Sequence, residues 1–85
     1  MMSRTQRVLQ KILGGTSDRG VRFRELRHLM KALKFDERIR GDHHIYSRAD
    51  VVEIINVQPR GAMAKAYQVK QVRELILKYR LAETN

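Results

Sequence analysis

The segment 35-FDERIRGDHHIY-46 decides the fold, because its pattern has a period of two on both sides of a turn. Residues 35, 37 and 39 alternate with the polar residues 36, 38 and 40, as expected for a strand with one buried face. Gly41-Asp42 then supplies a two-residue turn, and His43 to Arg48 forms the return strand. The segment therefore predicts an antiparallel β-hairpin.

The length of this turn determines which side chains share a face of the sheet. With a two-residue loop, Arg40 and His43 are direct cross-strand neighbours, and residues opposite one another lie on the same face. One face then carries Arg38, Arg40, His43 and Ile45, and the other, more apolar face carries Phe35, Ile39, His44 and Tyr46. A change of one residue in the loop would invert this assignment.

The other elements follow from the same kind of pattern. The β-branched run 51-VVEIINV-57 predicts a third strand, ended by Pro59 and Gly61, although Ala49-Asp50 is a poor turn signature. Apolar residues at helical spacing predict helices over residues 8–13, 22–34 and 66–81, the first stopped by Gly14-Gly15. We therefore expect an α+β fold: a three-stranded antiparallel sheet with helices on one face, and a solvent-exposed face available for binding.

The chain is strongly basic for its length. Its 85 residues carry 18 Lys and Arg against 9 Asp and Glu, a formal net charge of +9, and twelve of the cations are arginine. Arginine suits bidentate phosphate contacts and stacking on bases. Such an imbalance indicates a polyanionic partner, with RNA the best fit, although a solvated basic surface without such a partner is the alternative. A domain this small favours a shallow surface site over a deep pocket.

Several classes are disfavoured by what the sequence lacks. Cysteine is absent, which excludes a disulfide framework and a thiolate metal site. With no carboxylate or cysteine at ligand spacing, we expect no metal and no small-molecule cofactor. Residues 1–7 contain no continuous apolar run. We therefore expect no signal peptide, no membrane association and a cytoplasmic location.

Histidine is the candidate for chemistry, because it can accept and donate protons near neutral pH. His43 follows the turn beside two arginines, which suits a general base whose neighbouring cations hold a phosphate. His44 is either a packed residue or a supporting one, and His28 is expected at the surface of the second helix. Adjacent histidines on a strand point to opposite faces and cannot readily chelate one ion.

Much of the chain resembles a known protein family. The segment from Phe23 to Leu81, about two-thirds of the chain, resembles the HicA toxins of bacterial toxin–antitoxin pairs, and in particular a branch with an added N-terminal helix. The similarity is carried, in order, by the motifs 23-FREL-26, Gly41-x-His43 within residues 35–46, 56-NVQP-59 and 64-AKAYQVKQVR-73.

The resemblance implies an α-β-β-β-α fold like that of a double-stranded-RNA-binding domain. It also implies a metal-independent endoribonuclease that cleaves mRNA and is held inactive by a HicB-like antitoxin. The family's catalytic histidine corresponds to His43. On this basis residues 1–20 form an N-terminal helix and linker, and residues 21–85 form the HicA-like ribonuclease domain, within one compact unit overall.

One position departs from the family. Asp42 stands where Ser or Thr is usual, and its carboxylate would repel phosphate or favour a protonated His43.

The expected mechanism uses neutral His43 to take the proton of the RNA 2′-hydroxyl. Arg38 and Arg40 are expected to stabilise the charge on phosphorus, and Lys65 and Lys70 to hold a flanking phosphate. A solvated-face interpretation remains open for each of these four cations. Two alternatives also remain: a non-catalytic module that recognises RNA by shape and phosphates, and a protein-interaction module.

Overall fold

The computed structural model of the protein describes residues 2–83. Within these residues the elements follow one another in the order α1 (Arg4–Gly14), the 3-10 turn η1 (Asp18–Gly20), α2 (Phe23–Ala32), β1 (Asp36–Arg40), β2 (His43–Arg48), β3 (Val51–Val57), β4 (Pro59–Arg60), β5 (Met63–Ala64), α3 (Ala66–Lys78) and the 3-10 turn η2 (Leu81–Glu83).

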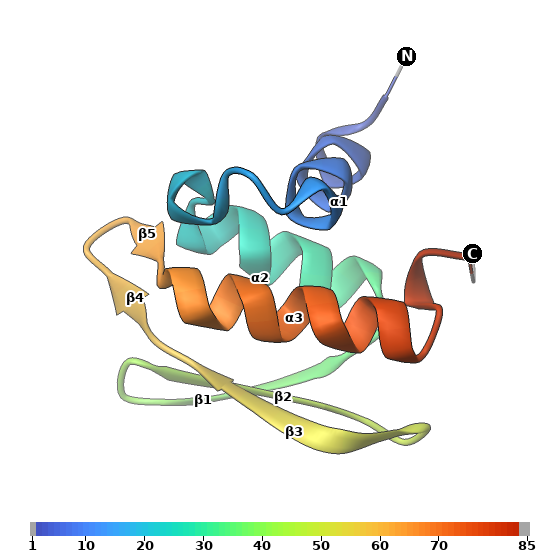
Figure 1. Ribbon diagram of the computed structural model, residues 1–85. Coiled ribbons are helices and arrows are strands. Elements are labelled where there is room, and N and C mark those ends of the chain that lie inside the picture. The colour runs from blue at the N-terminus through green and yellow to red at the C-terminus, as the bar shows by residue number, and fades with distance from the viewer. Residues whose placement is uncertain (1, 84–85) are drawn as a thin grey trace.

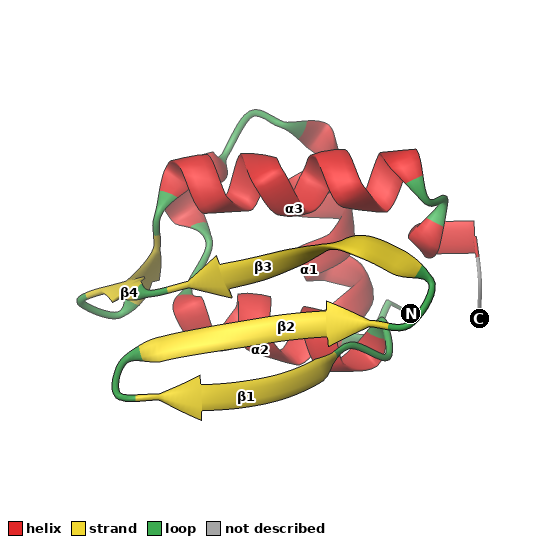
Figure 2. Cartoon of the chain, turned by 90° about the horizontal axis from the view of Figure 1, so that it is seen from below, coloured by secondary structure: helices red, strands yellow, loops and turns green. Residues whose placement is uncertain are grey.

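The elements form three layers. Strands β1, β2 and β3 make an antiparallel sheet in that order, and α2 and α3 cover one of its faces (Figures 1 and 2). Helix α1 packs on the side of α2 and α3 that faces away from the sheet, where Val8 and Ile12 are buried in the common core. The predicted α+β fold with one open sheet face is confirmed.

Helix α1 begins and ends at residues with recognisable capping roles. The Ser3 hydroxyl accepts a hydrogen bond from the Gln6 backbone N–H at 3.1 Å, and the Gln6 side chain accepts from the Ser3 N–H. The helix ends where Gly15 takes a left-handed φ of 72°. The predicted stop at Gly14-Gly15 is therefore confirmed.

The other two helices are shorter than predicted. Helix α2 starts at Phe23, and the Glu25 carboxylate accepts the Arg22 N–H at 2.8 Å. Lys34, with a φ of 70°, follows its end. Helix α3 stops at Lys78 and not at Leu81. Arg80 takes a left-handed φ of 53° there, which ends the regular helix before η2.

The β1–β2 hairpin has the predicted register. Arg40 pairs with His43 across the two-residue turn, and Gly41 has a φ of 61°, a conformation that favours glycine. Between β2 and β3 the chain also turns tightly, because Arg48 pairs with Val51. Arg48 there forms an ion pair with Asp50 at 2.8 Å. The predicted faces of the sheet follow from this register.

The small β4–β5 hairpin was missed by sequence reasoning, which took Pro59 and Gly61 only as the end of a strand. Its strands have two residues each, too few to show a period. The hairpin is tied to the start of α2, because the Phe23 N–H donates to Ala62 O at 3.0 Å and the Ala64 N–H donates to Val21 O at 2.9 Å.

A buried carboxylate joins the sheet to α2. The Glu37 side chain is 7% exposed and accepts two hydrogen bonds from the Arg27 guanidinium, at 3.0 and 3.1 Å. The Tyr46 hydroxyl donates to it, and the His44 ring lies 3.3 Å from it. The Arg27 hydrogen bonds, opposed by burial, lower the pKa of Glu37 from 4.5 to about 2. Burial raises the pKa of Tyr46.

This shift predicts an acid-dependent stability. Because the folded-state pKa of Glu37 is depressed, its contribution is complete above pH 4.5 and is lost as pH falls through about 2. Glu37→Gln should therefore lower the free energy of unfolding by about 3 kcal/mol at pH 6, and the difference from wild type should shrink toward pH 2. Urea unfolding of both proteins across this range measures it. A difference that stays constant with pH would contradict the assignment.

Candidate functional site

His43 is the first residue of β2 and stands on the open face of the sheet, directly after the turn. Its side chain is 45% exposed. Both ring nitrogens nevertheless have neighbours: Nδ1 lies 3.0 Å from Asn56 Oδ1, and Nε2 lies 3.0 Å from the Gln58 amide nitrogen. The ring is therefore held in one orientation while it remains accessible to a ligand.

These contacts form a directed chain of hydrogen bonds. The Lys65 ammonium lies 3.4 Å from Gln58 Oε1, and because an ammonium only donates, the Gln58 oxygen faces Lys65 and its NH₂ faces His43. His43 Nε2 therefore accepts, and Nδ1–H donates to Asn56 Oδ1. Of the two neutral tautomers of the ring, the arrangement favours the one with the proton on Nδ1, in which Nε2 carries the lone pair that a general base needs.

Gln68 holds the two amide residues in place. It lies in the first turns of α3, is 2% exposed and reaches the end of β3. Its Oε1 accepts the Gln58 N–H at 3.4 Å, and its NH₂ donates to Asn56 O at 3.3 Å. The docking of α3 against the sheet thus positions the groups that orient His43.

Sequence reasoning missed Asn56, Gln58 and Gln68 as parts of the site. Asn56 could have been found, because it pairs with Ile45 and the alternation of β3 places it on the face of His43. The contributions of Gln58 and Gln68 depend on how α3 docks, which the strand pattern does not contain.

Arg38 and Arg40 lie on the predicted face of the sheet, and Lys65 directly precedes α3. Arg40 pairs with His43, Arg38 pairs with Ile45, and both side chains are exposed. Within residues 2–83, neither arginine side chain forms a hydrogen bond or an ion pair. Lys65 joins the site through Gln58.

The structure does not bring Lys70 or His44 to His43. Lys70 is exposed and lies near Asp18, whose pKa is lowered mainly by the Arg73 hydrogen bonds and to a smaller degree by Lys70. His44 is buried on the opposite face, where it packs edge-on against Phe23 at 4.9 Å between ring centroids. Neighbouring residues of a strand point to opposite faces, so the packed interpretation of His44 fits its place better than the supporting one.

Asp42 stands beside the histidine, as the sequence suggested. Its Oδ1 lies 3.9 Å from His43 Nε2 and 3.5 Å from the Gln58 amide nitrogen. This carboxylate can stabilise a positive charge on the ring.

Further basic elements gather at the same end of the molecule. The β1–β2 turn, the β4–β5 hairpin and the first turns of α2 and α3 all lie at the left in Figures 1 and 2. These elements carry the cations Arg22, Arg40, Arg60 and Lys65. The same end also carries the carboxylates of Asp42 and Glu25, so its cations outnumber its acidic groups and its charge is positive, as a polyanion site requires.

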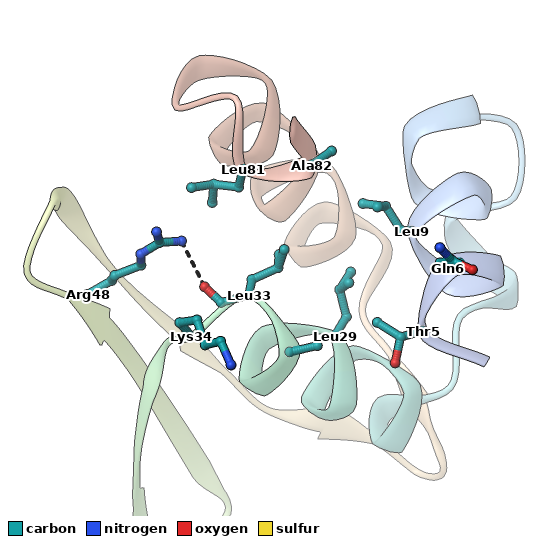
Figure 3. A pocket seen from close by; sticks show the side chains of 10 residues that line it. Thr5, Gln6, Leu9, Leu29, Leu33, Lys34, Arg48, Leu81 and Ala82 are labelled. Atoms are coloured by element: carbon teal, nitrogen blue, oxygen red, sulfur yellow. Dashed lines mark hydrogen bonds between the residues drawn. The ribbon is translucent and has the colours of Figure 1, made fainter. Parts of the chain in front are cut away.

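An apolar groove lies away from this end. A groove of about 390 Å³ runs between α1, the end of α2 and η2, and Figure 3 shows Leu9, Leu33 and Leu81 around it. Its Arg48 guanidinium donates to the Leu33 carbonyl at 2.8 Å (Figure 3). Among the described side chains of residues 2–82, the lining is mainly apolar and contains no histidine or carboxylate, so these residues supply no general base there.

Comparisons with known proteins identify no relative of this chain. No protein-family model matches the chain, and no curated protein or solved structure matches it significantly. Across residues 2–83, no helix is long and apolar enough to cross a membrane. The same part of the chain contains no group of three or more histidine or carboxylate side chains arranged to hold a metal ion.

The hydrogen-bond chain predicts an observable tautomer. In the wild-type protein, nitrogen-15 NMR of the neutral form of the His43 ring should show the proton on Nδ1. The reason is that Asn56 accepts at Nδ1 and Gln58 donates to Nε2. Asn56→Leu should weaken that preference without unfolding the protein, because it removes the acceptor at Nδ1, leaves the Gln58 donor at Nε2 in place, and changes an exposed residue. A proton found on Nε2 in the wild type would show that the chain runs in the opposite direction.

Proposed function

We propose that this protein is a metal-independent endoribonuclease that cleaves mRNA, as its resemblance to the HicA toxins implies. The observation that carries the proposal is the chain from Lys65 through Gln58 to His43 and Asn56. It supports the His43 tautomer in which the Nε2 lone pair, now bonded by the Gln58 NH₂, lies on the open face of the sheet beside arginines without acidic partners. A cytoplasmic location belongs to the same proposal.

The mechanism requires one base and one phosphate site. His43 Nε2 takes the proton of the 2′-hydroxyl, and the 2′ oxygen forms a bond to the adjacent phosphorus. The bond from phosphorus to the 5′ oxygen breaks, and that oxygen takes a proton from water. The products are a 2′,3′-cyclic phosphate and a 5′-hydroxyl end. Because the Gln58 NH₂ already bonds the Nε2 lone pair, it must move aside before a 2′-hydroxyl can use that lone pair.

The charges around His43 have separate roles in this mechanism. Arg40, directly across from His43, would stabilise the negative charge that develops on the phosphate oxygens. Asp42 would stabilise the imidazolium that forms when His43 takes the proton, at the cost of repelling phosphate. With one base and no evident acid, slow turnover is expected.

A HicB-like antitoxin belongs to the same proposal. The open sheet face exposes an apolar strip, with Val52 88% and Ile54 65% exposed, while Arg38 and Arg40 lie on the far strand β1. An acidic partner with apolar side chains would complement this face and cover His43, where it would compete with RNA for the same cations.

The proposal predicts that RNA cleavage requires His43 and does not require His28. His43→Ala should reduce the rate of RNA cleavage in EDTA by at least a hundredfold, the contribution typical of a general base. His28→Ala is the matched control, because His28 is exposed on α2 and should leave the rate unchanged. Gel analysis of labelled RNA gives the rates, and thermal melts establish that both variants fold.

The outcomes separate the proposed enzyme from its alternative. Equal cleavage by wild type and His43→Ala would exclude the general-base role. Tight RNA binding by a wild type that cuts no RNA would favour the non-catalytic RNA-binding module.

RNA binding should also weaken steeply with salt. Each phosphate that a cation neutralises contributes a slope of about −0.7 in log K against log salt concentration for single strands. Arg40→Ala should make the slope less negative by about that amount, because Arg40 has no acidic partner among residues 2–83. Fluorescence anisotropy at several salt concentrations measures both slopes. An affinity that does not change with salt would rule out a polyanionic ligand.

A further inference from the structure

A basic groove borders the His43 site. Its volume is about 650 Å³, and it is lined by Arg19, Arg60, Met63, Ala64, Lys65, Ala66 and Tyr67. Three of these residues are cations and none is acidic. Arg19 and Arg60 are exposed and form no ion pair within residues 2–83. The nearest carboxylate in sequence, Asp18, is already held by Arg73 at 2.8 Å. The positive charges of the groove are therefore not neutralised by the protein, and an anionic ligand would neutralise them.

An aromatic ring stands in this groove with much of its surface in solvent. Tyr67 is 65% exposed, although it belongs to the first turn of α3, beside the buried Gln68. Its hydroxyl accepts a hydrogen bond from the Gln68 NH₂ at 3.4 Å. An exposed ring that is held at one end can act as a platform for a flat ligand.

The groove is continuous with the site through shared residues. Lys65 lines the groove and also bonds Gln58, which contacts His43. Gln68 bonds the Tyr67 hydroxyl and also bonds Asn56, which contacts the other nitrogen of His43. A strand bound at His43 can therefore continue past Lys65 into the groove.

The geometry points to a nucleotide subsite in this groove, in which Tyr67 stacks on an unpaired base and Arg19 and Arg60 hold the flanking phosphates. This inference rests on the proposed function and makes it more specific. The ligand is single-stranded RNA, because a base within a duplex has no free face to offer an aromatic ring.

The test uses wild-type protein and short 2′-O-methyl oligoadenylate, which lacks the nucleophile and cannot be cleaved. Tyr67→Ala should weaken binding about 5- to 100-fold, the loss typical of one stacked base, whereas Tyr67→Phe keeps the ring and should retain most of the affinity. Leu77→Ala is the matched control, because Leu77 is 63% exposed at the other end of α3. An abasic oligonucleotide of the same length should bind wild type and Tyr67→Ala equally.

A spectroscopic measurement tests stacking directly. The chain contains no tryptophan, so Tyr67→Trp introduces a single tryptophan whose emission can be excited selectively. Oligoadenylate should quench it, and the abasic oligonucleotide should not.

The contrary outcomes are distinct. If cleavage depends on His43 but Tyr67→Ala binds oligoadenylate as tightly as wild type, the subsite alone is wrong. If wild type binds neither oligonucleotide, the proposed function fails as well. If polyglutamate binds as tightly as RNA and also requires Tyr67, the groove receives an acidic protein segment, and the nucleotide assignment is overturned.

Discussion

The two-residue turn at Gly41-Asp42 is the constraint on which the rest of the structure depends. It fixes the pairing of Arg40 with His43, and through the alternation of the strands it fixes the face of every other side chain in the hairpin. A slip of one residue would move Glu37 away from Arg27 and would send His43 into the core. The left-handed φ of Gly41, 61°, is the local conformation that makes this short turn available. Fold and site therefore share one determinant.

Core stability and the candidate chemistry are separated by the sheet. The buried face holds Glu37 against Arg27 and Tyr46, a network that ties β1 to α2. The open face holds His43 between two side-chain amides that are themselves fixed by α3. A change at His43 therefore alters an exposed ring, whereas a change at Glu37 leaves buried cationic and hydroxyl groups without their partner. The two faces can be examined by substitution independently.

The sequence predicted the sheet well because period and turn chemistry are local properties. The strands His43 to Arg48 and Val51 to Val57 were predicted with the bounds that the structure shows. Helix ends were less accurate, since left-handed residues such as Arg80 cannot be recognised from composition. The position of His43 on the open face followed from the hairpin, but its partner Gln58 did not. Gln58 is positioned for this contact by Gln68 of α3, which lies ten residues further along the chain. The contact therefore depends on how α3 docks against the end of β3, which no local pattern contains.

The central claim is that His43 activates the 2′-hydroxyl of RNA, and the ends of the cleaved strands test it most directly. RNA incubated with the protein in EDTA should yield fragments that end in a 2′,3′-cyclic phosphate and begin with a 5′-hydroxyl. A substrate with deoxyribose at the cleaved position should remain intact, because it lacks the nucleophile. Fragments with 5′-phosphate ends, or cleavage at the deoxyribose position, would contradict the account, since neither can arise from attack by the 2′ oxygen.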